Sequence, residues 1–247
     1  MKLLCLGTSH GAPSKDRFTS CYVLEVNDSL YIFDAGAPVT EQLLQKGKDL
    51  IQVKAFFNSH FHADHIHGGI NMLMLFQWFY KDADLDVCLP DGKTKRAIKS
   101  YARRIEDIFY WDKRIRFHVM KPGHVFDDGI LRVTAIPVKH FCRPDKRSYA
   151  FMIEAQGKKI LYTGDLSGGL KKRDFPVIAF VEKFDLILSE CAHFSLEALE
   201  ECMQKVDTKR LVVTHIYPEE KRNDISAWKD KFPFEVIVAE DNLEIEI

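Results

Sequence analysis

The stretch SHFHADHIHGG, residues 59–69, places four histidines and an aspartate within eight positions. It follows a short β-type run and precedes a helical pattern. Because His60, His62 and Asp64 alternate, an extended backbone would project their side chains to one side, while His65 would face elsewhere. Imidazole and carboxylate groups are the usual ligands of zinc, manganese and iron. The stretch therefore predicts a metal site at the end of a strand.

Around this stretch, short β-type runs alternate with helical patterns along the 247 residues. The expected strands are 2–6, 21–26, 30–34, 53–57, 86–89, 115–119, 130–136, 150–155, 158–162, 185–188, 211–214, 235–238 and 243–247. The expected helices are 39–47, 64–80, 94–109, 176–183, 196–205 and 218–231. Strands first in a meander and then alternating with helices predict a layered α/β protein, with two sheets inside and helices outside. We expect residues 1–247 to form a single domain.

The composition is that of an ordinary globular protein, with 46% hydrophobic and 29% charged residues and a formal net charge of −1. This charge gives no global electrostatic reason to expect a nucleic-acid or membrane partner. The six cysteines are scattered and form no CxxC pair, which argues against a disulfide framework and suits a reducing cytosol. The apolar part of the opening residues is too short for a signal peptide, and the apolar run 70–80 is about half of what a bilayer requires. We expect a cytoplasmic protein without a membrane span.

Four other β-type runs each end in a single histidine or aspartate. These runs are LYIFD, AIPVKH, KKILYTGD and LVVTH, and they end in Asp34, His140, Asp165 and His215. A polar residue at the end of a buried strand is costly unless it is paired or metal-bound. One loop cannot complete the ligand set of two metals, so these strand ends are the candidates for the remaining ligands.

Taken in order, FDAG, HFHADH, the strand-end His140, YTGD and VVTH resemble the motifs of the metallo-β-lactamase superfamily, and they cover nearly the whole chain. The resemblance implies a four-layer αββα sandwich with two metals at one edge. It assigns the first metal to His60, His62 and His140, the second to Asp64, His65 and His215, and the bridging position to Asp165. It also implies that Asp34 orients a ligand histidine. For His67, both a place in the site and a place merely near it stay open.

Three features separate the branches of this superfamily. Position 165 is Asp, where true metallo-β-lactamases usually carry Cys, and the cluster lacks the Glu of flavo-diiron oxidoreductases. The opening GTSHGAPSKDRFTSCYVLE resembles the phosphodiesterase branch, which includes RNase Z and the cyclic phosphodiesterase of phosphonate breakdown. RNase Z usually carries a long tRNA-gripping arm, and the interval between His140 and Asp165 leaves no room for one. The resemblance therefore favours a small or cyclic phosphodiester over tRNA.

Outside the ligand set, His193 in LILSECAHFS is the most informative residue, and we expect Asp64 and His193 to be the catalytic residues. In the phosphodiesterase branch, a histidine in a similar context contacts the scissile phosphate or assists the leaving oxygen. The alternative is a histidine that only hydrogen-bonds the start of a helix. Three basic residues, Arg143, Lys146 and Arg147, follow His140 and either reach a substrate phosphate or are simple surface charge.

The sequence thus predicts a dinuclear metal-dependent hydrolase that uses two divalent ions, zinc or manganese with iron as a further option. The favoured reaction is hydrolysis of a small or cyclic phosphodiester by a metal-bound hydroxide. The alternatives are a thioester or lactone hydrolase and, less favoured, a nucleotide-sensing domain without turnover. The basic run 93–104 matches the polar face of a helix, so nucleic acid is not the favoured partner. The resemblance also suggests a homodimer.

Overall fold

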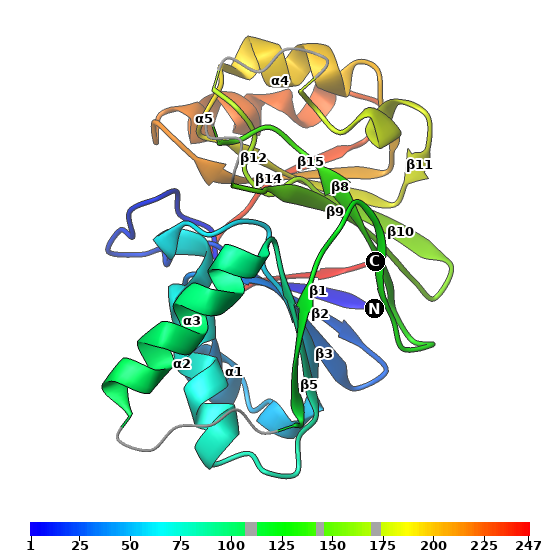
Figure 1. Ribbon diagram of the computed structural model, residues 1–247. Helices are drawn as coiled ribbons and strands as arrows, with labels where there is room; N and C mark the ends of the chain where they lie inside the picture. Colours follow the sequence, from blue (N-terminus) through cyan, green and yellow to red (C-terminus); the bar gives the residue numbers. More distant parts are fainter. Residues whose placement is uncertain (107–112, 142–145, 169–173) are drawn as a thin grey trace.

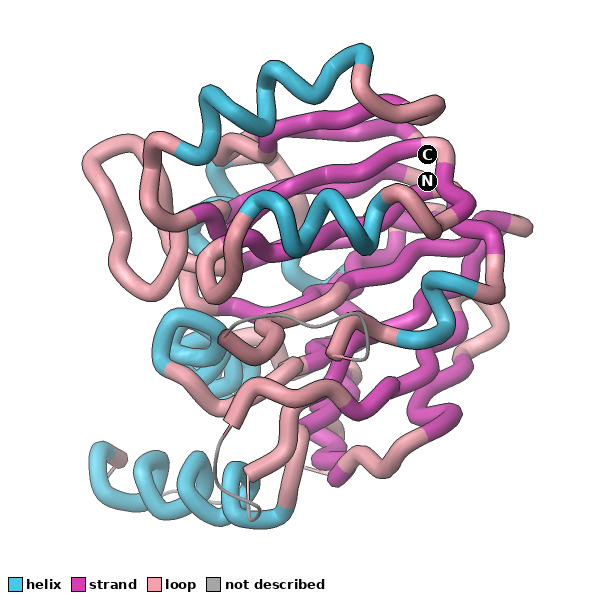
Figure 2. The backbone as a smooth tube through the Cα atoms, turned by 90° about the horizontal axis from the view of Figure 1, so that it is seen from above, coloured by secondary structure: helices cyan, strands magenta, loops and turns pink. Residues whose placement is uncertain are grey.

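The computed structural model describes residues 1–106, 113–141, 146–168 and 174–247. Two seven-stranded sheets pack face to face, and helices cover the outer face of each (Figure 1). The predicted αββα architecture is confirmed. Seen from above, the strands fill the middle of the molecule and the helices lie at its outside (Figure 2).

The strands of each sheet follow one another in space in an order that differs from the chain order. The first sheet is formed by β16 (Leu243–Glu246), β1 (Lys2–Gly7), β2 (Cys21–Val26), β3 (Ser29–Ala35), β4 (Val53–Phe57), β5 (Leu85–Leu89) and β6 (Ile115–Val119). The second is formed by β15 (Glu235–Val238), β14 (Arg210–Ile216), β12 (Leu186–Cys191), β10 (Lys158–Tyr162), β9 (Tyr149–Ala155), β8 (Arg132–Pro137) and β7 (Gly123–Asp127). A small parallel pair joins β11 (Lys183–Phe184) to β13 (Asp207–Thr208). The last strand, β16, returns to pair with β1, so the two termini lie close together (Figure 1).

Helices lie on both outer faces. The first sheet is covered by α1 (Val39–Gln45), α2 (Ala63–Trp78) and α3 (Gly92–Ile105), and the second by α4 (Leu196–Met203) and α5 (Lys221–Ser226) (Figure 1). Short 3₁₀ turns are η1 (Leu50–Gln52), η2 (Val177–Phe180) and η3 (Ala227–Asp230). No helix in the described ranges combines the length and the apolar character that a membrane crossing requires.

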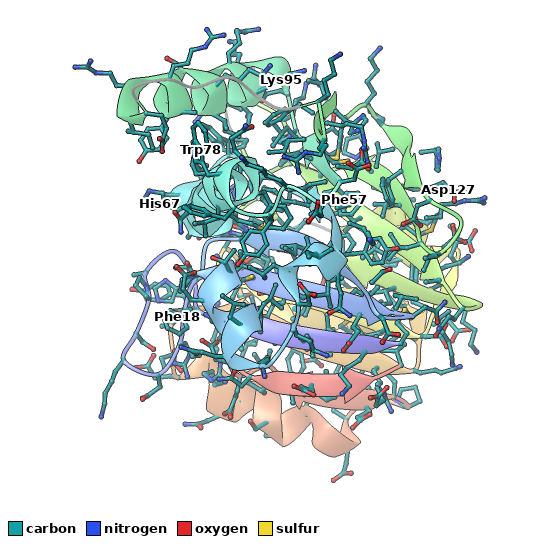
Figure 3. The ribbon with its side chains drawn as sticks, turned by 90° about the horizontal axis from the view of Figure 1, so that it is seen from below. Phe18, Phe57, His67, Trp78, Lys95 and Asp127 are labelled. Carbon is teal, nitrogen blue, oxygen red and sulfur yellow. The ribbon has the colours of Figure 1, made fainter. Side chains whose placement is uncertain are left out.

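Aromatic side chains fill the space between the sheets. Phe33 and Phe57 stack at 4.9 Å between ring centroids, and Phe151 of the opposite sheet lies 6.0 Å from Phe57, which is labelled in Figure 3. All three are at most 2% exposed. Burial of apolar surface on both faces of each sheet is the dominant stabilising contribution in such a layered fold. This rigid centre holds the strand ends that carry the polar residues.

Several strands run parallel to their neighbours, so their carboxyl ends meet at one edge. In the first sheet β3 is parallel to β4, and Phe33 pairs with Phe57. In the second sheet β10, β12 and β14 are parallel, and Glu190 pairs with Thr214. The residues that directly follow these strands therefore converge, as ligand sites in α/β folds usually do.

Most of the expected elements match the structure within a few residues, and some do not. The expected helix at 176–183 is instead the 3₁₀ turn η2 followed by β11, and the expected helix at 218–231 is divided into α5 and η3. The strands β7, β11 and β13 were not expected, since each is short or follows a Pro-Gly turn signal. Residues 107–109 of the expected helix at 94–109 lie outside the described residues.

Two local predictions show why the chain turns where it does. Gln156 and Gly157 form the predicted two-residue turn between β9 and β10, with φ of 51° and 71°. The extended backbone expected over residues 60–64 ends at His62, which caps α2 with φ −89° and ψ 150°. Asp64 therefore lies in the first helical turn rather than on an extended segment. The cysteines within the described ranges, Cys5, Cys21, Cys88, Cys191 and Cys202, are free and buried.

Candidate metal centre

The structure brings together all seven residues predicted as metal ligands, in two groups that share Asp165. His60 and His62 lie in the loop after β4, and Asp64 and His65 lie in the first turn of α2. The others come from the second sheet, where His140 follows β8, Asp165 follows β10, and His215 lies at the end of β14. In each group, one ligand atom per residue lies within 4.8 Å of the others.

The first group consists of His60, His62, His140 and Asp165. The Nε2 atoms of His60 and His140 each lie 3.0 Å from Nδ1 of His62. Oδ2 of Asp165 lies 3.7 Å from Nε2 of His60 and 3.9 Å from Nε2 of His140. Three imidazole nitrogens and a carboxylate oxygen therefore face one another around a common point.

Hydrogen bonds on the far sides of these rings fix which nitrogens carry lone pairs. Nδ1 of His140 donates to the carbonyl oxygen of Leu166 at 3.1 Å. Nδ1 of His60 lies 3.0 Å from Oγ of Ser59, and that hydroxyl itself donates to Asp34, so the ring nitrogen is the donor. The Nε2 atoms of His60 and His140 therefore both direct lone pairs at Nδ1 of His62. One proton on that Nδ1 cannot form a good hydrogen bond to both of them. A divalent cation between the three nitrogens fits this arrangement.

The second group consists of Asp64, His65, His215 and Asp165, and it is more buried. Nε2 of His65 lies 3.3 Å from Oδ2 of Asp64 and 3.3 Å from Oδ1 of Asp165. Nε2 of His215 lies 3.3 Å from the same oxygen of Asp64 and 3.7 Å from Oδ2 of Asp165. The short spacing again places nitrogen and oxygen ligands around one point.

The polar atoms of the second group also fit a cation. Nδ1 of His65 donates to Asp34 at 2.8 Å, so the neutral form of this ring would present the lone pair of its Nε2 to a cation. That Nε2 and Oδ1 of Asp165 are both buried without a hydrogen-bond partner. An unpaired buried polar atom costs about 1–3 kcal/mol, and a cation would satisfy both. The residues present in the two groups therefore fit two divalent metal ions.

The buried carboxylates favour positive charge within the two groups. Burial, together with the neighbouring His140, lowers the pKa of His62 to about 4, so this ligand is neutral. Burial lowers the pKa of His65, but the charge of Asp165 outweighs it and raises that pKa well above its ordinary value. Burial raises the pKa of Asp165, but His215 and His65 outweigh it and hold that pKa well below its usual range. A positive charge is therefore favoured beside the two carboxylates.

Asp34 forms hydrogen bonds that orient a histidine of each group. It lies at the end of β3 with φ 54°, in the left-handed region that is uncommon for residues other than glycine. Its carboxylate accepts hydrogen bonds from Nδ1 of His65, from Oγ of Ser59 and from the hydroxyl of Tyr162, at 2.8, 2.6 and 2.7 Å. Asn58 and the amide of Ser59 donate to its other oxygen. Asp34 thus orients His65 directly and His60 through Ser59.

His193 lies beside both groups and is held by a residue that sequence reasoning missed. Its ring centroid lies 4.9 Å from that of His140 and 5.6 Å from that of His215, and its Nε2 lies 3.9 Å from Oδ2 of Asp165. Its Nδ1 lies 2.9 Å from both carboxylate oxygens of the buried Glu190. The signal was present, since LILSE is a further apolar strand that ends in a polar residue. Burial lowers the pKa of His193, but the hydrogen bond and charge of Glu190 outweigh it and raise that pKa.

The predicted basic residues are only partly placed. Arg143 lies outside the described residues. Lys146 is exposed, with Nζ 4.8 Å from the centroid of the Phe141 ring, and Arg147 is exposed beside it. On the outer helix α3, Lys95 (labelled in Figure 3) donates from Nζ to the carbonyl oxygen of Phe117 in β6 at 3.4 Å, so this residue of the basic run contacts the first sheet.

His10 and His67 lie in different parts of the structure. His67 is exposed on α2 at the edge of the molecule (Figure 3), and it lines a shallow groove with Tyr101 and Ile105. It is not part of a ligand group in the described residues. The ring of His10 contacts that of Tyr217, with 4.6 Å between centroids.

Comparison with known proteins identifies relatives of the same fold. The sequence model of the family described as Anti-Pycsar protein Apyc1 matches residues 1–229. Ribonuclease Z of Picosynechococcus sp. is 31% identical over 144 residues, which cover 57% of this chain and 44% of that protein. Ribonuclease Z of Methanothermobacter thermautotrophicus is 23% identical over 308 residues, covering 100% of this chain and 97% of that protein. The chain spans about half the length of two of these relatives. The share is 44% for the protein of Picosynechococcus sp. and 49% for ribonuclease Z of Shouchella clausii.

Solved structures of similar fold include proteins of the metallo-β-lactamase fold. The metallo-β-lactamase fold protein YhfI of Bacillus subtilis superposes with a TM-score of 0.78 at 20% identity, covering 99% of both chains. The short form of human tRNase Z gives 0.76 at 22% identity, covering 100% of this chain and 99% of that one. A diphosphatase of the PhnP family gives 0.73 at 19% identity, covering 100% and 97%. The predicted resemblance to the metallo-β-lactamase superfamily, in the branch that contains RNase Z, is confirmed, and the chain belongs to the family of the Anti-Pycsar protein Apyc1.

Proposed function

We propose that this protein is a dinuclear metal-dependent phosphodiesterase that acts on a small or cyclic phosphodiester. The observation that carries the proposal is the position of Asp165, which belongs to both ligand groups, with His193 beside both. Its Oδ2 faces His60 and His140 of the first group and His215 of the second, and its Oδ1 faces His65. Relatives named ribonuclease Z and a structural neighbour named diphosphatase support chemistry at phosphorus.

In this proposal, His60, His62 and His140 hold one cation, Asp64, His65 and His215 hold the other, and Asp165 contacts both. Two divalent cations bound in this way supply Lewis acidity, lower the pKa of a bound water to about 7 and neutralise negative charge on a phosphate. Zinc, manganese and iron all suit these nitrogen and oxygen ligands. The residues of the chain supply the orientation and the proton transfers.

His193 is suited to act as the general acid. Glu190 holds its Nδ1, so a protonated ring presents its Nε2–H toward the two groups. A water oxygen forms the new bond to phosphorus while the ester bond breaks, and Nε2 of His193 donates its proton to the departing oxygen. Oδ2 of Asp64, which faces both His65 and His215, is placed to accept the proton that the attacking water loses. In the alternative role, His193 only binds the phosphate.

The favoured substrate is small because of the chain between β8 and β10. The described residues of that interval form the β9–β10 hairpin, which pairs within the second sheet and provides no separate RNA-binding element. Many surface cations are also paired, as in the ion pairs of Arg17 with Glu219 and of Lys231 with Glu200. A long nucleic acid would need a continuous basic surface.

The experiment compares two ester classes on the purified protein loaded with zinc or manganese. We expect hydrolysis of bis(p-nitrophenyl) phosphate that chelation abolishes and added metal restores. A thioester should be hydrolysed far more slowly. The His62→Ala variant, which lacks one ligand of the first group, should lose metal by elemental analysis and lose turnover in parallel. Turnover of the thioester alone would refute the proposal and favour acyl chemistry at the same metals.

A further inference from the structure

A small cavity adjoins the first ligand group. It lies between the start of α3 and the chain around His140, and its volume is about 180 Å³. The lining residues are Phe61, Asp91, Lys93, Thr94, Ala97, Phe141, Lys146 and Arg147. Figure 1 shows α3 on the outer side of the first sheet.

The ring of Phe141 lines this cavity and also contacts the first ligand group. The Phe141 ring lies 4.8 Å from the ring of His62, 5.0 Å from that of His140 and 5.6 Å from that of His60, between centroids. Phe61 lies between His60 and His62 in the chain and is only partly buried. A group that enters the cavity would therefore contact two aromatic side chains while the rest of its molecule reaches the ligands.

The chemistry of the lining favours a flat ring that carries oxygen atoms. Phe61, Phe141 and the methyl group of Ala97 supply apolar contact, and aromatic rings pair favourably with other rings. The ammonium of Lys146 lies 4.8 Å from the centroid of Phe141, at a position from which it can bind a carbonyl or nitro oxygen at the edge of such a ring. The carboxylate of Asp91 already accepts hydrogen bonds from the amides of Lys93 and Thr94, so it is engaged in capping α3.

The size of the cavity limits the occupant to one ring system. Sites for drug-sized ligands have volumes of about 300–1,000 Å³, well above this cavity. We propose that this cavity binds a single flat ring attached to the substrate while the phosphodiester of the same molecule lies at the two ligand groups. This inference rests on the proposed function, and it makes Phe61, Phe141 and Lys146 determinants of substrate specificity.

The test measures binding separately from turnover. Phenylphosphonate and methylphosphonate share one anionic group and differ only in the ring, and neither is a phosphate ester. We expect calorimetry on the zinc-loaded protein to show that phenylphosphonate binds about tenfold more tightly. This preference should fall to less than about twofold in Phe141→Ala and in Ala97→Phe.

The Ala97→Phe variant tests the cavity even if Phe141→Ala fails to fold. Ala97 is exposed on α3, so a larger side chain there fills the cavity without removing core contacts. Tyr217→Ala is the matched control, because Tyr217 is an aromatic residue that is 54% exposed and lies near the other ligand group. It should leave the preference unchanged. An undiminished preference in both Phe141→Ala and Ala97→Phe, or a preference lost in Tyr217→Ala instead, would overturn the inference.

Turnover distinguishes this inference from the proposed function. We expect p-nitrophenyl phenyl phosphate to have a higher kcat/KM than methyl p-nitrophenyl phosphate, and Ala97→Phe to remove the difference. Hydrolysis of both diesters with an unchanged ratio in the variant refutes the ring site and leaves the phosphodiesterase intact. A ring preference in binding without hydrolysis of either diester supports the ring site and refutes the phosphodiesterase. Absence of binding by either phosphonate refutes the ring site.

Discussion

Two buried carboxylates, Asp34 and Glu190, support the site from opposite sheets and do so in different ways. Asp34, at the end of β3, accepts hydrogen bonds from its own sheet and also from the hydroxyl of Tyr162 in the second sheet. Glu190, at the end of β12, accepts only from its own half of the molecule within the described residues, from the amides of Leu166 and Ala192 and from His193.

This difference predicts two kinds of defect. Asp34 joins the sheets and orients a residue in the buried ligand group, so its loss should affect metal retention and folding. Glu190 orients a residue outside the two proposed ligand sets, so its loss should affect turnover while the metals stay bound. Measuring metal content and turnover in the same variants distinguishes a defect in metal retention from a defect in turnover alone.

The largest expected effect on turnover is that of His193→Ala. Loss of a general acid typically costs about 10²–10⁴-fold, and the loss should be greatest for an alkyl ester, whose leaving oxygen needs a proton. A p-nitrophenyl ester, with a good leaving group, should lose much less. Elemental analysis should still find both metals. Equal turnover of the alkyl ester by variant and wild type would remove His193 from the mechanism.

Asp34→Asn should reduce metal affinity by about 10–100-fold, as changes in residues that orient a ligand histidine typically do. One oxygen of Asp34 accepts from Ser59, His65 and Tyr162, and an amide nitrogen at either position would face donors. Each donor left unpaired costs about 1–3 kcal/mol, so stability toward urea should fall as well. Chelator titration should remove the metal of the group containing His65 first. Simultaneous release of both metals would show that Ser59 transmits the change equally to His60.

Glu190→Gln should have a smaller effect, about tenfold, and it should depend on pH. Burial lowers the pKa of His193 and the charge of Glu190 raises it, with a net increase. A general acid must be protonated, so turnover of an alkyl ester falls as the pH rises through this pKa. Removing the charge lowers the pKa, and the fall should therefore occur at lower pH in the variant. The pH profile of kcat/KM measures where activity falls on the alkaline side. An alkaline limb unchanged in the variant would mean that Glu190 only fixes the backbone before His193.

The contrast also shows what the sequence can predict. His60, His62, Asp64 and His65 are adjacent in the chain, so their chemistry was visible as a local cluster. Asp34, like the ligand candidates on the second sheet, was visible because an apolar strand ending in one polar residue is unusual. Parallel strands then explain why such ends meet at one edge.

Other parts of the site depend on contacts between distant segments. Glu190 matters because β12 pairs with β10, which brings the amide of Leu166 to its carboxylate. The bond from Tyr162 to Asp34 crosses from one sheet to the other, and strand alternation alone indicates only which face Tyr162 lies on. The cavity beside Phe141 likewise forms only when α3 packs near the chain after β8. A helix was predicted over residues 176–183, but β11 begins at Lys183, and only Val177–Phe180 forms a 3₁₀ turn, η2.

The smallest expected effect on turnover is that of Tyr162→Phe, which removes the hydrogen bond from the second sheet to Asp34. Burial and the charge of Asp34 raise the pKa of the Tyr162 phenol well above its ordinary value, so it stays protonated and donates throughout the accessible pH range. Hydrogen bonds to charged groups contribute about 1.5–3 kcal/mol, and the phenyl ring still fills the same space. We expect a loss of stability of that size in urea unfolding, with both metals retained and turnover reduced less than threefold. If metal affinity fell as far as in Asp34→Asn, the link between the sheets, rather than the carboxylate itself, would be what holds His65 in place.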